Sequence, residues 1–98
     1  MKIEGNVVQG GIYKVYTEEG IKRLADALAR RIRKYAPKSP EEYERLIWSF
    51  VEREYQRLTK DAYDGVLVIL EGSNRVVMID DPVQLMDALE EVEFYDMI

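Results

Sequence analysis

The sequence predicts an α+β domain in which two β-hairpins form a mainly antiparallel sheet and a two-helix hairpin covers it. Segments rich in β-branched and aromatic residues, each interrupted by turn residues, occur near both ends of the chain. Two long amphipathic segments with helix-start signals lie between them. The predicted order is strand, strand, helix, helix, strand, strand, helix and a last segment that is a strand or an ordered tail. One domain (1–98) is expected, because 98 residues cannot bury two separate cores.

The first predicted hairpin lies in the segment IEGNVVQGGIYKVYT. Its β-branched and aromatic residues favour strands, and Gly10 and Gly11 interrupt them at a point where a tight turn would fit. We therefore expect strands near 2–8 and 11–16.

Two amphipathic helices are predicted next, over about 18–36 and 40–61. Thr17 is a suitable N-cap for the first helix, and Pro37 ends it because proline disfavours helical geometry in the residue before it. The motif SPEE, which begins at Ser39, combines an N-cap, a proline in the first helical position and a glutamate that can complete a capping box. The short connection predicts an antiparallel helix hairpin laid on the sheet.

The second predicted hairpin lies in the segment GVLVILEGSNRVVMIDD, with strands near 66–71 and 75–80. Gly72, Ser73 and Asn74 separate the two apolar runs, and residues of these types permit a reversal of the chain. This hairpin is expected to complete the sheet.

The strand from Val66 to Leu70 is apolar at every position, whereas a strand with one solvated face alternates. This pattern predicts burial on both faces of the sheet. Asp81 and Gln84 predict the start of a short helix over about 82–91, which we expect to supply part of the cover.

Composition excludes several classes of function. The chain contains no Cys and no His, which excludes disulfides, thiolate metal sites and catalytic triads built on these residues.

No apolar run approaches the roughly 18 residues of a membrane span, and the N-terminus lacks the apolar segment of a signal peptide, so a cytoplasmic location is expected. No phosphate loop or dinucleotide-binding glycine pattern occurs, and no cofactor is expected. The high share of charged residues is typical of heat-adapted and of designed proteins.

A basic cluster lies on the predicted helix 18–36, although the net charge of the chain is −5. On a helical wheel its members fall opposite the apolar stripe or on its flank. Three interpretations fit: a solvated helix face, a contact surface for the phosphates of a nucleic acid, or a docking surface for an acidic partner. The third gains support from residues 80–98, which carry seven acids and no base. The cluster consists of Arg23, Arg30, Arg31, Arg33 and Lys34.

The doubly apolar strands and the opposite charges of the two ends favour self-association. The leading hypothesis is therefore a non-catalytic protein-interaction module that forms a homo-oligomer, most simply a dimer. Trp48 and Tyr55, on one face of the second helix, are candidate contact residues, because aromatic side chains dominate binding hot spots. A small nucleic-acid-binding protein that uses the basic cluster is the alternative.

A carboxylate-dependent enzyme is the third hypothesis. Glu54 lies within the apolar stripe of the second helix, where it needs a cation or another donor, or else lies in a pocket as an acid/base group. Asp64, Asp80 and Asp81 lie at the same end of the second hairpin, where carboxylates can bind Mg²⁺. However, Asp81 already has a role as an N-cap, and Asp64 with the following glycine is typical of a turn. No catalytic or metal-binding residue is assigned.

Overall fold

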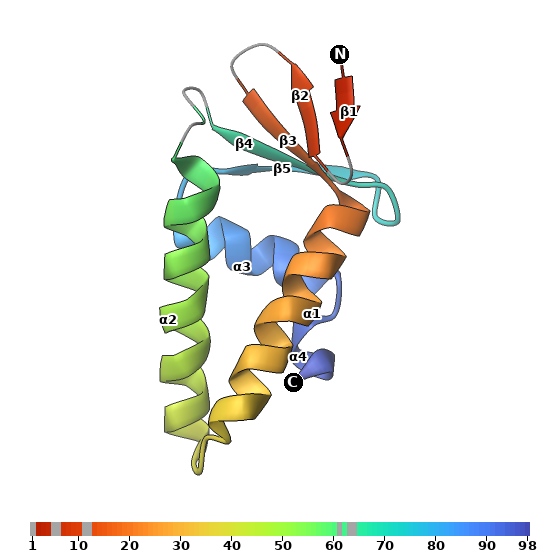
Figure 1. Ribbon diagram of the computed structural model, residues 1–98. Coiled ribbons are helices and arrows are strands. Elements are labelled where there is room, and N and C mark those ends of the chain that lie inside the picture. Colours follow the sequence, from red (N-terminus) through yellow and green to blue (C-terminus); the bar gives the residue numbers. More distant parts are fainter. Residues whose placement is uncertain (1, 5–6, 11–12, 61, 63–64) are drawn as a thin grey trace.

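A mixed β-sheet with helices on one side makes up the fold in the computed structural model (Figure 1). The structure describes residues 2–4, 7–10, 13–60, 62 and 65–98, with side chains from residue 14 onwards. The strands are β1 (Lys2–Glu4), β2 (Val7–Gly10), β3 (Tyr13–Thr17), β4 (Val66–Leu70) and β5 (Arg75–Ile79). The helices are α1 (Glu18–Tyr35), α2 (Pro40–Thr59), α3 (Pro82–Glu91) and α4 (Phe94–Met97).

The sheet has the strand order β1-β2-β3-β4-β5, and its central pair is parallel. The other three pairs are antiparallel. The α+β class, the mainly antiparallel pairing and the second hairpin (β4 with β5) are confirmed. The prediction that the sheet consists of two hairpins is wrong, because its central pair is parallel and its N-terminal part has three strands. Parallel neighbours need a long crossover connection, and α1 and α2 together supply it between β3 and β4.

The N-terminal segment contains three short strands, where the sequence predicted two. The strand expected near 2–8 is divided into β1 and β2, and residues 5–6 between them lie outside the described part of the chain. Gly10 is the last residue of β2. Gly11, the second residue of the predicted turn, lies outside the described part of the chain, as residues 5–6 do.

The predicted starts of the three longer helices are confirmed by their caps. The side chains of Thr17, Ser39 and Asp81 each accept a hydrogen bond from the backbone N–H three residues later, at 3.1 Å. Each bond satisfies one of the donors that a helix leaves free in its first turn. The Glu42 carboxylate reaches back to the N–H of Lys38, at 2.7 Å, one residue before the N-cap.

Ala36 ends α1 in the left-handed region, with φ 48° and ψ 61°. A β-carbon makes this conformation costly, whereas glycine adopts it freely. Ala36→Gly is therefore expected to raise the free energy of unfolding by about 0.5 to 1 kcal/mol, measured by urea denaturation. Ala27→Gly, at an exposed position inside the same helix, is the matched control and is expected to lower it by about 1 kcal/mol. A loss of stability in both variants would contradict the assignment of strain to Ala36.

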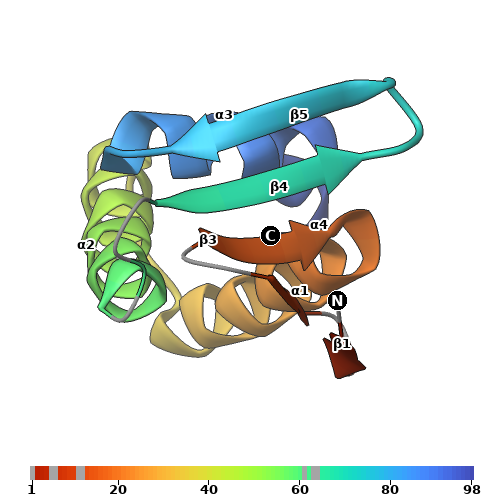
Figure 2. The ribbon, with the colours of Figure 1, turned by 90° about the horizontal axis from the view of Figure 1, so that it is seen from above.

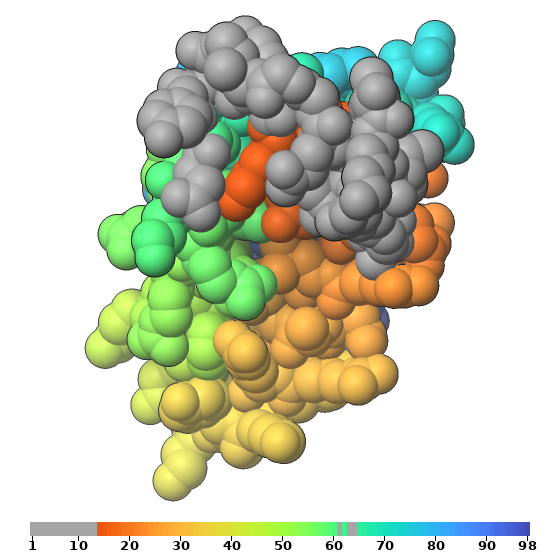
Figure 3. Space-filling view, turned by 45° about the horizontal axis from the view of Figure 1, so that its top comes forward, coloured from red at the N-terminus to blue at the C-terminus, as the bar shows by residue number. Residues whose placement is uncertain are grey.

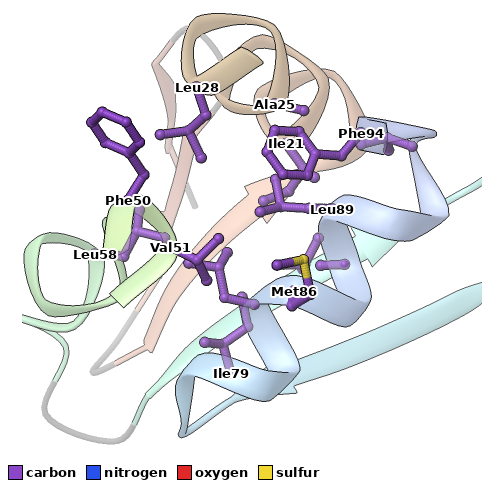
Figure 4. Close-up of a cluster of buried hydrophobic side chains, with 14 of the residues drawn as sticks. Ile21, Ala25, Leu28, Phe50, Val51, Leu58, Ile79, Met86, Leu89 and Phe94 are labelled. Atoms are coloured by element: carbon purple, nitrogen blue, oxygen red, sulfur yellow. The ribbon is translucent and has the colours of Figure 1, made fainter. Parts of the chain in front are cut away.

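The hydrophobic core lies between the sheet and the helices, as the close-up in Figure 4 shows. Helix α3 packs against β5 and lies on the same side of the sheet as α1 and α2 (Figure 1). The prediction that this helix covers the second face is therefore wrong. The last segment forms the short helix α4, whose Phe94 is fully buried in the core.

Candidate functional site: the open face of the sheet

One face of β4 is not buried, in contrast to the prediction from its continuous apolar sequence. Val66, Val68 and Leu70 point into the core and are buried. Leu67 is half-buried and Ile69 is 37% exposed, on the opposite face of the strand. Successive side chains of a strand point to opposite faces, and the helices cover only one of them. The burial of β4 therefore alternates although its hydrophobicity does not.

The register of the sheet gathers six side chains into two cross-strand rows on this open face. Val15 of β3 lies opposite Leu67, which lies opposite Met78 of β5. The second row runs from Thr17 through Ile69 to Val76. None of the six is charged; Ile69 and Val76 are exposed, and the other four are half-buried. The open face is defined by Val15, Thr17, Leu67, Ile69, Val76 and Met78.

Seen from above in Figure 2, β4 and β5 lie on the viewer's side of the helices. Within the described ranges no helix crosses this side of the two strands. Among the described strands β5 pairs with β4 alone, so it is one of the two edges of the sheet. The largest contiguous apolar patch on a monomeric soluble protein, typically a few hundred Å², is often a functional surface. The open face is therefore the strongest candidate for a functional surface.

Trp48 and Tyr55 lie on α2, on the helix-covered side of the sheet and away from the open face. The Trp48 indole donates a hydrogen bond from Nε1 to Glu44 Oε1, at 3.0 Å, and the ring packs at the rim of the core. The Tyr55 hydroxyl donates to the backbone carbonyl of Asp80, at 2.8 Å. Both rings thus have structural contacts within the chain, and the structure does not bring them together with the apolar strands.

The four arginines of the basic cluster have contacts within the chain. Arg30 forms an ion pair with Asp26 at 2.9 Å, and Arg23 forms one with Glu19 at 3.5 Å. Exposed pairs of this kind contribute little to stability, but they satisfy the cations. Lys34, the last member, is exposed.

Two of these arginines reach other parts of the fold. Arg33 donates a hydrogen bond to the backbone carbonyl of Met97, and this bond joins α1 to the C-terminal segment. The acceptor is a backbone oxygen and not one of the acidic side chains of residues 80–98. Arg31 points toward α2, where it meets Glu54 at 3.8 Å. These contacts favour a helix face engaged within the molecule over a row of free cations.

Glu54 is buried, with only 4% of its surface exposed, at the junction of α1, α2 and β3. Arg57 Nη2 lies 2.6 Å from its Oε2, and Arg31 Nη1 lies 3.8 Å from its Oε1. The pKa of the nearby Tyr16 hydroxyl is raised, mainly because the group is partly buried. The positive charge of Arg57 lowers this pKa, and the negative charge of Glu54 raises it. The carboxylate therefore has the cationic partners that its place in the apolar stripe requires. The i to i+3 spacing of Glu54 and Arg57 was visible in the sequence.

The described residues hold no cluster of three or more acidic side chains that could bind a metal ion. Asp64 lies outside them, and Asp80 and Asp81 are exposed. Of the helices in the described part of the chain, none has the length and apolar character to span a bilayer.

The chain matches no protein-family model, no curated protein and no solved structure. A functional proposal therefore rests on the geometry of the molecule.

Proposed function

We propose that the protein is a non-catalytic interaction module that associates with a second copy of itself through the open face of the sheet. The observation that supports the proposal is the pair of cross-strand rows, in which β3, β4 and β5 present six uncharged side chains on the side without helices. Pairing two such faces would bury apolar surface in the way that two packed sheets do. The aliphatic residues on this face would then have the burial that their sequence pattern indicates.

The size of the face sets how strong the association can be. The three strands of the open face, about 4.8 Å apart and about five residues long at 3.3 Å per residue, give a flat area of about 240 Å². A stable interface of standard size buries about 800 Å² on each partner. The open face alone is therefore expected to give a concentration-dependent dimer rather than a permanent one.

The test is to place charges on the open face and to measure the molecular mass in solution. Ile69 and Val76 are cross-strand neighbours, so Ile69→Lys with Val76→Glu adds one charge of each sign and leaves the net charge of the chain unchanged. Opposite charges at a cross-strand pair support the hairpin within the monomer. Sedimentation equilibrium from micromolar to near-millimolar protein is expected to show a monomer–dimer equilibrium for the wild type and a monomer for this double variant.

Val83→Glu with Ala27→Lys is the matched control, because it adds the same two charges at exposed positions on α3 and α1, away from the open face. It is expected to dimerise as the wild type does. A wild type that stays monomeric over the whole concentration range would refute the proposal. Equal dissociation of the control variant would show that the interface lies elsewhere.

A further inference from the structure

The edge strand β5 has backbone groups without partners. In an antiparallel pair each strand turns alternate residues toward its neighbour, so the N–H and C=O groups of the other residues point away from it. Apart from its pairing with β4, β5 makes no backbone hydrogen bond within the described part of the chain. The outward backbone groups of residues 75–79 form the free edge of β5. This edge is a template on which another strand can pair.

The two edges of the sheet differ in the features that prevent such pairing. Proteins protect their edge strands by making them very short or by placing prolines, lysines or bulges in them. At the other edge β1 has only three residues, whereas β5 has five, contains no proline or lysine, and pairs with β4 in a continuous register. The one charged residue of β5, Arg75, is its first residue and forms an ion pair with Glu91 of α3. The free edge of β5 is therefore unprotected.

A groove between β5 and α3 is lined by acidic side chains. Four exposed acids, Asp87, Glu90, Glu91 and Glu93, line it together with Arg75. Figure 2 shows α3 beneath β5, with the free edge of β5 at the top of the view. Among the described residues none of α1 or α2 lines this groove; the side chains of these two helices lie against each other on the side shown in Figure 3. A strand paired with the free edge would direct one row of its side chains toward this acidic groove.

A second copy of the chain does not fit the free edge. Helix α3 packs against β5, so two β5 strands paired about a twofold axis would bring two copies of α3, and two sets of acids, beside each other. Like charges placed opposite each other oppose association. The single cation of β5, Arg75, is already paired with Glu91 and supplies no compensation.

We propose that the free edge of β5 binds an extended segment of a partner protein in which lysine or arginine alternates with aliphatic residues. Successive side chains of the added strand point to opposite faces. Its aliphatic side chains would continue the rows of the open face beyond Met78 and Val76, of which Val76 is 63% exposed. Its cations would lie over the acidic groove. The proposal does not depend on self-association, because the added strand pairs with the edge of the sheet and does not pack on its face.

A capped peptide of alternating lysine and valine, with the length of β5, is the probe. Backbone hydrogen bonds supply the affinity in this mode of recognition, so amide exchange of residues 75–79, followed by NMR, reads the pairing directly. At a peptide concentration about ten times Kd, the outward N–H groups of β5 are expected to exchange about tenfold more slowly. The same peptide with glutamate in place of lysine is expected to bind at least about tenfold more weakly.

Two N-methylated peptides distinguish strand pairing from simple attraction of charges. In an extended peptide the backbone N–H groups of the lysines point to one edge and those of the valines to the other. Methylating the N–H groups of one residue type therefore blocks one edge and leaves the charge and the side chains unchanged. One of the two methylated peptides is expected to bind as the parent peptide does, and the other is expected not to bind. Equal effects of the two methylations would overturn the proposal.

Two variants of the protein test the role of the groove. Asp87→Asn with Glu90→Gln removes two of its charges at nearly constant side-chain size and is expected to weaken binding of the lysine peptide about fivefold. Glu41→Gln with Glu52→Gln removes two exposed acids from α2 and is the control, expected to bind as the wild type does. Thermal unfolding checks that both variants are folded. Equal weakening in both would show a general effect of charge and would overturn the site.

Two results with the wild type would overturn the proposal as well. The first is unchanged amide exchange at residues 75–79 up to millimolar peptide. The second is exchange at these residues that slows as the protein concentration rises, without peptide, because the free edge would then bind a second copy of the chain.

Discussion

Replacing both Arg31 and Arg57 with alanine is expected to lower the free energy of unfolding by about 3 to 5 kcal/mol. The double variant leaves the Glu54 carboxylate buried without a cation, and an uncompensated buried charge costs far more than the intact pair contributes. Single exposed arginines elsewhere on α1 cost little when they are removed. Urea denaturation of the wild type and the double variant measures the difference.

Adding Glu54→Leu to that double variant tests the cause. A hydrophobic side chain of similar volume can replace a buried ion pair at little cost, so the triple variant is expected to recover most of the lost stability. The double variant Arg23→Ala with Arg30→Ala also removes two cations, both from α1, and is the control, with an expected change of less than about 1 kcal/mol. If the triple variant is no more stable than Arg31→Ala with Arg57→Ala, the loss does not come from the buried carboxylate.

Phe94→Ala is the second variant for which we expect a large effect. Among the described residues Phe94 is the largest fully buried side chain, and it anchors the four-residue helix α4 in the core (Figure 4). Truncating a buried phenylalanine leaves a cavity and is expected to cost about 3 to 5 kcal/mol. Small domains have a total stability of about 5 to 15 kcal/mol, so this loss is a large part of the whole.

Two further variants locate that effect. Phe94→Leu keeps most of the buried volume and is expected to cost less than about 1.5 kcal/mol. Tyr95→Ala changes the neighbouring ring, which is exposed, and is expected to cost less than about 1 kcal/mol. If Tyr95→Ala were as destabilising as Phe94→Ala, the anchor of α4 would be the aromatic pair rather than the buried ring.

The helices could be predicted from the sequence because their signals are local. Thr17, Ser39 and Asp81 each bind a backbone N–H three residues away, so the cap and the group it satisfies are read from one short segment. The predicted range 82–91 agrees with α3, and the predicted ends of α1 and α2 are one and two residues too late.

The arrangement of the strands could not be predicted because it depends on contacts between distant segments. The parallel pairing that places Val15 beside Leu67 leaves no mark within either strand. An aliphatic side chain also looks the same in the sequence whether a helix covers it or not, so the run from Val66 to Leu70 did not reveal the open face. The burial of Glu54 is consistent with its place in the stripe, but Arg31 as its partner depends on how closely α1 approaches α2.

The crossover between β3 and β4 has a kinetic consequence. The central pair of the sheet joins Lys14 to Val66, so the chain must first close a loop that contains both long helices. The entropy lost in closing such a loop precedes the gain from the contacts, whereas β4 and β5 meet across a four-residue turn. The C-terminal hairpin can therefore form early and by itself, and the N-terminal strands can join it only after α1 and α2 have folded back. We therefore expect the union of the two halves of the sheet to be the slow step of folding.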